Sequence, residues 1–176
     1  KKNRLGLLTA VQDQLRSIEE DTLKLDHPEL EEFEDLFYLH LKNNDALLTK
    51  DNEVEIFTEG QEKFHALLED IESATDHVHL LYYIWRDDQL GQRLSELLIK
   101  KIEEGVKVRV LYDDMGSRTL SRKYIKRIKK AGGEMEAFFP ALIPKLNMKI
   151  NYRNHRKLAI IDGKIGYIGG FNVGDE

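Results

Sequence analysis

The spacing of apolar residues along the chain changes after about residue 53. Before this point, apolar side chains recur at helical intervals from Leu8 to Ile18, and Pro28 is placed to open a second helix. Beyond it, short apolar runs alternate with amphipathic stretches. This rhythm predicts an α/β fold, a mixed and largely parallel sheet flanked by helices, with a helical appendage over residues 1–45.

Within residues 46–176, the runs predict individual strands and helices. Strands are predicted at 54–57, 77–85, 106–112, 135–139, 158–161 and 165–168. Helices are predicted around 64–71, 94–102 and 121–131, and Gly105 is placed to end the second of these. Between the last two strands, Asp162 and Gly163 form the pair that is typical of a tight two-residue hairpin turn.

The composition narrows the class of protein. With 176 residues, 41% of them hydrophobic and 34% charged, the chain is typical of one folded globular domain. The absence of cysteine excludes disulfides and thiolate metal sites. No apolar run approaches the roughly 20 residues of a membrane span, so we expect this chain itself to be soluble.

The charge is unevenly distributed along the sequence. The net charge of −5 argues against a protein that coats nucleic acid, and nucleic acid is not an expected partner. Acidic residues dominate from 19 to 72, whereas 118–130 and 145–157 are basic. The basic part either faces a phosphate-rich surface or is a solvated helix face.

The residues with the most chemistry lie near the end of the chain. His155 and Lys157 are two apart on an extended segment, so both side chains are predicted to project to one face and to converge on one phosphate. After the hairpin, Gly170 lets the backbone approach a ligand closely, and Asn172 offers an amide donor. Together they supply a nucleophile or acid, a charge clamp and an orienting donor.

The pattern His155-x-Lys157-x4-Asp162, followed by Gly169-Gly170-x-Asn172, is similar to the HKD motif of the phospholipase D superfamily. The alternative is a basic hairpin with an incidental histidine. Further stretches resemble bacterial cardiolipin synthases, namely 43–48, 82–88, 111–117, 151–157 and 168–176. The resemblance implies that residues 46–176 are a first phospholipase D-like domain with one HKD motif, and that a second HKD half completes the site.

The resemblance also implies roles for these residues. His155 attacks the phosphodiester phosphorus to give a phosphohistidine, or protonates the leaving alkoxide. Lys157, Asn172 and Gly170 hold phosphate oxygens, so neither a metal nor another cofactor is expected. Asp162 belongs to the motif, but its place in the turn favours a structural role.

Other residues leave two interpretations open. Asp113, Asp114 and Ser117 follow a predicted strand and either bind a glycerol headgroup or cap the next helix. Tyr82, Tyr83 and Trp85 either line a lipid channel or belong to the core. His77 and His79 alternate onto one strand face, as a metal pair or as ordinary structural histidines.

The leading hypothesis is a phosphatidyltransferase that makes cardiolipin and glycerol from two phosphatidylglycerol molecules. The alternatives are a phosphodiesterase, a nuclease or phospholipid hydrolase, active as a single-motif homodimer, and a non-catalytic lipid-binding module. The expected partners are phosphatidylglycerol, an anionic membrane surface and the second HKD half. The resemblance places the full-length protein at the cytoplasmic face of the cell membrane, with anchoring helices ahead of Lys1, and this chain alone is expected to be nearly inactive.

Overall fold

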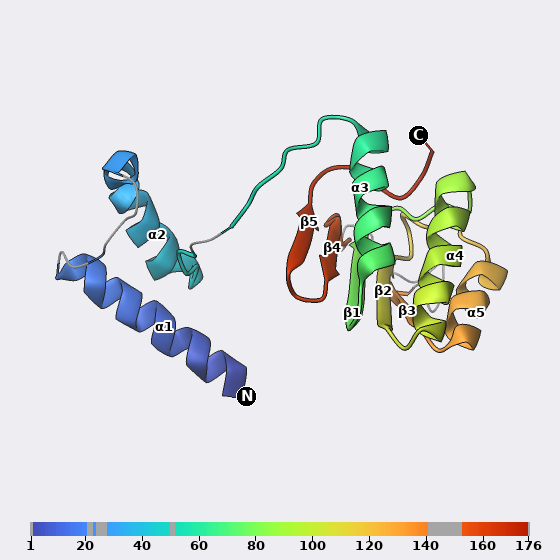
Figure 1. Ribbon diagram of the computed structural model, residues 1–176, viewed down its shortest axis with the longest axis horizontal. Coiled ribbons are helices and arrows are strands. Elements are labelled where there is room, and N and C mark those ends of the chain that lie inside the picture. The colour runs from blue at the N-terminus through green and yellow to red at the C-terminus, as the bar shows by residue number, and fades with distance from the viewer. Residues whose placement is uncertain (1, 21–22, 24–27, 50–51, 141–152, 176) are drawn as a thin grey trace. The chain divides into compact units, whose positions relative to one another are not determined.

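The computed structural model describes residues 2–20, 23, 28–49, 52–140 and 153–175 (Figure 1). By its internal contacts the chain divides into two compact units, Lys1–Glu55 and Ile56–Glu176. The expected boundary between residues 45 and 46 falls inside the first unit, and the assignment of 46–176 to one domain stays a prediction. None of the helices in the described ranges has the length and apolar character needed to cross a membrane.

The first unit is the expected helical appendage. It contains α1 (Lys2–Glu19), the 3-10 helix η1 (Pro28–Phe33) and α2 (Glu34–Asn44), so Pro28 opens a 3-10 turn before the α-helix. Val11 of α1 and Leu41 of α2 are buried. The Gln14 side chain exchanges two hydrogen bonds with the backbone of Leu48, of 2.8 and 3.0 Å, which tie the segment after α2 back to α1.

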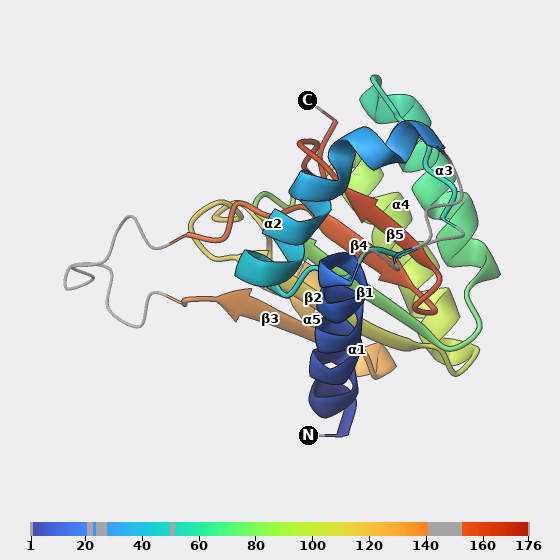
Figure 2. The same ribbon diagram turned by 90° about the vertical axis from the view of Figure 1, so that its left-hand side faces the viewer.

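The second unit is built on a five-stranded sheet with the order β3-β2-β1-β4-β5 (Figure 2). The strands are β1 (His77–Tyr82), β2 (Lys107–Asp113), β3 (Glu134–Phe138), β4 (Leu158–Ile161) and β5 (Ile165–Ile168). β1, β2 and β3 are parallel, whereas β4 pairs antiparallel with both β1 and β5. The expected mixed sheet is confirmed, with its parallel part confined to the three strands that helices connect.

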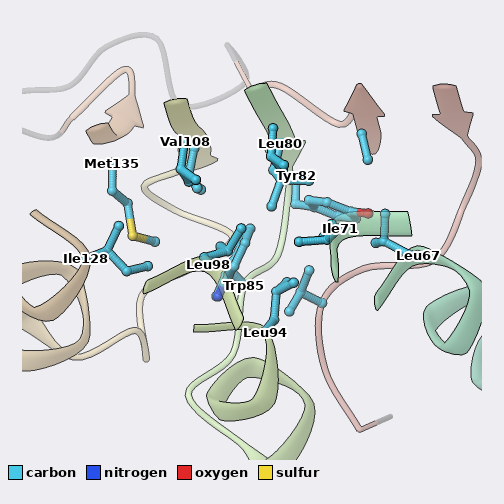
Figure 3. Close-up of a cluster of buried hydrophobic side chains, with 14 of the residues drawn as sticks. Leu67, Ile71, Leu80, Tyr82, Trp85, Leu94, Leu98, Val108, Ile128 and Met135 are labelled. Carbon is cyan, nitrogen blue, oxygen red and sulfur yellow. The ribbon is translucent and has the colours of Figure 1, made fainter. Parts of the chain in front are cut away.

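The core lies between this sheet and the helices α3 (Gly60–Ser73), α4 (Gln89–Glu103) and α5 (Arg122–Ala131). Alternate strand residues, such as Leu80 and Val108, point toward helix residues such as Leu98 and Ile128 (Figure 3). Burial of one strand face and one stripe of each helix is the main favourable term for such a fold. The largest buried side chain, Trp85, donates its ring N–H to the Tyr124 hydroxyl at 2.9 Å.

Two expectations about strands are wrong. Residues 54–57 form no strand, and Val54 and Ile56 are 81% and 84% exposed. An apolar run without a neighbouring strand has nothing to pair with, so its β propensity is not expressed. β1 also ends at Tyr82 instead of residue 85, because the chain bends there, and Trp85 keeps only an isolated bridge to Val173.

The β4–β5 hairpin has the expected ends but a longer connection. The Lys164 N–H donates to the Ile161 carbonyl at 3.0 Å and encloses Asp162 and Gly163, whose φ angles are +52° and +65°. Positive φ at both central residues is what a primed turn requires, and it favours an Asp-Gly pair. Strand pairing starts at Ile161 and Ile165, so three residues connect the strands instead of two.

Candidate active site

The segment that follows β1 brings the predicted phosphate-binding residues together. The ring of Tyr83 stacks on the ring of His155, with centroids 3.9 Å apart and planes 18° from parallel. The Lys157 Nζ lies 5.6 Å from the centroid of the same Tyr83 ring and donates to the His155 carbonyl at 2.9 Å. His155 and Lys157, which lie just before the start of β4, therefore both contact the side chain of one residue.

Asn172 reaches the next residue of this segment. Its side-chain oxygen accepts a hydrogen bond from the Ile84 N–H at 3.1 Å. The backbone beside it pairs as well, because the Val173 N–H donates to the Ile84 carbonyl and the Arg86 N–H donates to the Val173 carbonyl. Within the described residues the Asn172 amide nitrogen has no partner, so it can donate to a ligand.

Two aspartates hold in place the segment after β5, residues 169–175, which contains Asn172. The Asp175 carboxylate accepts from the Gln89 and Leu90 N–H groups at the start of α4, at 2.9 and 3.0 Å. Asp88 is the N-cap of α4: its Oδ1 accepts from the Gly91 N–H, and its Oδ2 accepts from the Asp175 N–H at 2.9 Å. Helix N-terminal N–H groups lack partners inside the helix, so these carboxylates anchor the segment there. Sequence reasoning did not single out either residue.

Gly169 and Gly170 stand in open space. Neither has a positive φ, and a Cβ built on either would meet no atom within 4 Å. Neither the backbone conformation nor packing within the described chain requires glycine at these positions. A requirement for glycine here would therefore come from a molecule that approaches the backbone.

Asp113 and Ser117 are buried and bonded to backbone. Asp113 accepts from the Met115 and Gly116 N–H groups with one oxygen and from the Asn154 N–H, at 3.0 Å, with the other. The Ser117 hydroxyl donates to the Tyr83 carbonyl at 3.2 Å and accepts from the Trp85 N–H at 3.0 Å.

Asp113 and Ser117 therefore bond to the backbone that supports the site residues, and these bonds do not involve the side chains of His155, Lys157 or Asn172. The cap of α5 is Ser121, which accepts from the Tyr124 N–H, so neither Asp113 nor Ser117 caps that helix. A headgroup-binding role for Asp113, Asp114 and Ser117 stays a prediction.

Asp162 lies at the other end of β4 from Lys157, roughly 17 Å along an extended chain. Its carboxylate accepts three backbone N–H bonds, from Thr75, Asp76 and His77 at 2.8 to 2.9 Å, and one from the Thr75 hydroxyl at 3.0 Å. These bonds hold the pKa of Asp162 well below its usual range. They fasten the β4–β5 hairpin to the loop that precedes β1.

The aromatic residues after β1 divide between the core and the site. Tyr82 and Trp85 are 1% and 0% exposed and belong to the core. Tyr83 is only half-buried and stacks on His155, a contact that sequence reasoning missed. The alternation of side chains along β1 was the available signal, since it separates Tyr83 from Tyr82.

His77 and His79 sit at the opposite end of β1. Their rings are 4.7 Å apart, and the His77 Nδ1 lies 2.8 Å from the Asp76 carboxylate. Burial lowers the pKa of His79, with a contribution from His77 beside it. In the part of the chain that the structure describes, no three or more His, Asp or Glu side chains are grouped so that they could hold a metal ion.

A groove of about 1150 Å³ borders Asn172 on the helix side. It is lined by the start of α3, by residues between Ile84 and Arg93, and by residues 170–175. The lining combines apolar side chains, such as Phe64 and Phe171, with charged side chains of both signs: Arg86, Arg93, Glu59, Glu62 and Asp175. His155 and Lys157 are not among the lining residues, so the groove extends from the Asn172 side of the site.

This chain is similar to a known protein family and to solved structures. Residues 67–176 match the family model described as "Cardiolipin synthase, PLD-like domain". The solved structures of Nuc from Salmonella typhimurium and NucT from Helicobacter pylori are each 21% identical to this chain. They cover 63% and 65% of it, and 64% and 69% of their own chains, with TM-scores of 0.45 and 0.48.

The chain belongs to the family of phospholipase D-like domains of cardiolipin synthases. A cardiolipin synthase of Oceanobacillus iheyensis is 64% identical over 176 residues, all of this chain. The major cardiolipin synthase ClsA of Bacillus subtilis is 47% identical over 175 residues, 99% of this chain. In both cases the chain spans 36% of the length of the relative.

We predict that Asp162→Asn destabilises the protein in a pH-dependent way. Folding lowers the pKa of the Asp162 carboxyl. Its contribution to the free energy of unfolding is therefore fully present above the ordinary pKa of 3.8 and is lost as the pH falls below that value. At pH 7 the variant should melt several degrees below the wild type, and the difference should shrink as the pH falls from about 5 to 2. Thermal melts across this range measure it. The exposed control Glu96→Gln should leave the profile unchanged, and a constant difference at every pH would contradict the assignment.

A second prediction concerns the stack on Tyr83. Tyr83→Phe keeps a flat ring against His155, whereas Tyr83→Leu removes it. The ring protons of His155 in NMR spectra should therefore keep their ring-current shift in the phenylalanine variant and lose it in the leucine variant. An unchanged shift in Tyr83→Leu, with circular dichroism like that of the wild type, would show that the stack is absent in solution.

Proposed function

We propose that this chain supplies one half of the active site of a phosphatidyltransferase that makes cardiolipin and glycerol from two phosphatidylglycerol molecules. The observation that carries the proposal is the convergence of His155, Lys157 and Asn172 on the consecutive residues Tyr83 and Ile84. Imidazole, ammonium and amide are the groups needed to attack and hold a phosphodiester. Membership of the cardiolipin synthase family and the names of the relatives support the lipid substrate.

The reaction runs in two displacements at phosphorus. The neutral imidazole of His155 attacks the phosphorus of the first phosphatidylglycerol, a P–N bond forms, and the P–O bond to glycerol breaks. Glycerol leaves after taking a proton from an acid of the second HKD half. The terminal hydroxyl of a second phosphatidylglycerol then gives its proton to that group and attacks the phosphohistidine. A P–O bond forms to this hydroxyl oxygen, the P–N bond to His155 breaks, and cardiolipin and the free imidazole are released.

The other residues hold charge and position. Lys157 turns from the His155 carbonyl to the non-bridging oxygens, whose negative charge persists through both steps. The Asn172 amide nitrogen donates to the same phosphate, and the backbone at Gly170 leaves room for it. Asp162 acts at a distance, because it holds the hairpin that carries these residues in place.

The second HKD half comes from outside this chain. One source is the rest of a full-length protein, because the chain spans 36% of the length of its relatives. A second copy of this chain is the other source of the missing half, and it would suit a phosphodiesterase instead of a transferase.

The deciding experiment is turnover of labelled phosphatidylglycerol by the full-length protein, with plasmid nicking as a parallel assay. We expect cardiolipin and glycerol in equal amounts, no nicking, and no turnover with His155→Ala. Lys157→Ala should reduce kcat by roughly 100-fold or more, as removal of a charge-stabilising donor does elsewhere. Nicking without cardiolipin formation would overturn the transferase and favour the phosphodiesterase.

A further variant tests the place of Gly170. Gly170→Ala should leave the melting temperature unchanged, because the added Cβ meets no atom within 4 Å. It should lower kcat roughly 10- to 100-fold if the phosphate lies against this backbone, since small displacements of a reacting group are costly. The matched control is Gly166→Ala on β5, where an added Cβ also meets nothing. Full activity of Gly170→Ala would place the phosphate elsewhere.

A further inference from the structure

Helix α5 and the loop before it carry a concentration of positive charge that the proposed chemistry does not use. Between residues 118 and 133 there are seven cations and no acidic residue, in a chain whose net charge is −5. Six of the seven are exposed. These six form what we call the basic ridge: Arg118, Arg122, Lys123, Lys126, Lys129 and Lys130.

The ridge is held on a well-anchored helix. Tyr124 and Ile128 are buried on the opposite face of α5, at 1% and 0% exposure. Ser121 caps the first turn, and Gly132 ends the helix in the left-handed conformation. The seventh cation, Arg127, is turned inward and donates to the Gln92 side chain at 2.8 Å. The exposed cations are therefore presented together on one fixed face.

The ridge lacks internal counter-ions over most of its length. Lys129 pairs with Glu136 at 2.6 Å. Among the described residues, no ion pair joins Arg122, Lys123, Lys126 or Lys130 to a carboxylate. Like charges three or four positions apart repel on a helix, and an ordinary solvated helix offsets this with alternating signs. Among the described residues, only the Lys129–Glu136 pair offsets this repulsion, and an anionic partner would relieve the rest.

The first part of the ridge lies at the same edge of the sheet as the candidate active site. The loop 114–121 leaves the carboxyl end of β2, where Asp113 bonds to the Asn154 N–H beside His155. Arg86, two residues after Ile84, donates to the Thr119 side chain of this loop at 3.0 Å. Met115, three residues before Arg118 in the same loop, is 37% exposed.

From these observations we propose that the basic ridge docks the protein on an anionic phospholipid surface. The proposal deepens the proposed function, on which it rests, by naming the face that meets the lipid. A cluster of roughly four to eight exposed cations is attracted to the negative surface of an anionic bilayer. Docking through Arg118 and Arg122 brings the edge with His155 to the headgroups, where phosphatidylglycerol is available. Membership of the cardiolipin synthase family favours a lipid over a nucleic acid as the partner.

The test measures binding of the purified chain to vesicles, with and without phosphatidylglycerol in phosphatidylcholine. The ridge variant combines Lys123→Gln, Lys126→Gln and Lys130→Gln, which removes three charges and keeps good helix formers. The control combines Lys100→Gln, Lys107→Gln and Lys164→Gln, which makes the same charge change at exposed positions outside the ridge. Circular dichroism confirms that each variant is folded.

The wild type and the control should bind only the vesicles that contain phosphatidylglycerol, and more weakly as salt rises. The ridge variant should bind on the order of 100-fold more weakly. Equal binding by the ridge and control variants, or equal binding to pure phosphatidylcholine, would overturn the proposal. Tighter binding to duplex DNA than to vesicles, lost in the ridge variant, would overturn it in favour of a nucleic acid.

A second measurement separates this proposal from the proposed function. In the full-length protein, the ridge variant should keep its turnover of phosphatidylglycerol dispersed in detergent, where no surface has to be found. It should lose turnover of phosphatidylglycerol in vesicles. If the wild type turns over neither form while the ridge still governs vesicle binding, the docking surface stands and the transferase assignment fails. If the ridge variant loses turnover in detergent too, the ridge acts in the chemistry and the docking proposal fails.

Discussion

The buried backbone that follows β1 fixes the positions of the chain segments around the candidate active site. Trp85 is fully buried, so the chain from Tyr83 to Arg86 enters the interior and its polar groups need partners. Ser117 bonds to the Tyr83 carbonyl and the Trp85 N–H. Asn172 bonds to the Ile84 N–H, and Val173 pairs with the backbone on both sides. The hydrogen bonds to residues 83–86 therefore bring together the loop after β2, which carries Ser117, and the segment after β5, which carries Asn172 and Val173.

Several aspartates in this domain accept hydrogen bonds from backbone N–H groups. Asp162 holds the far end of the hairpin, Asp113 holds the residue before His155, and Asp175 holds the chain after Asn172. Each bond is between a charged acceptor and an N–H group, the kind that contributes more than a neutral pair. Because these aspartates bond to backbone, the side chains proposed to contact phosphate are the neutral or cationic ones of His155, Lys157 and Asn172. These groups do not repel a negatively charged substrate.

The proposed chemistry and the proposed docking face share one edge of the sheet. His155 stacks on Tyr83 at the end of β1, and the basic ridge begins in the loop that leaves β2. Parallel strands joined by helices bring such loops to one edge, which is where ligands bind in many α/β proteins. An enzyme whose substrate remains in a bilayer needs its nucleophile close to its membrane-docking face, because the lipid headgroup must reach the nucleophile without leaving the surface.

Elements with a local signal could be predicted from the sequence. Periodicity predicted α3, α4 and α5, the Asp162-Gly163 pair predicted the hairpin, and the motif spacing indicated His155, Lys157 and Asn172. Long-range packing leaves residues 54–57 unpaired, stacks Tyr83 on His155, and bonds the Asp113 carboxylate to backbone N–H groups. The Asn172 to Ile84 bond joins residues 88 apart, and the Asp113 to Asn154 bond joins residues 41 apart. A local pattern records whether a residue favours a strand or the interior, but it does not record which distant partner will satisfy it, because that choice is made by packing of the whole core.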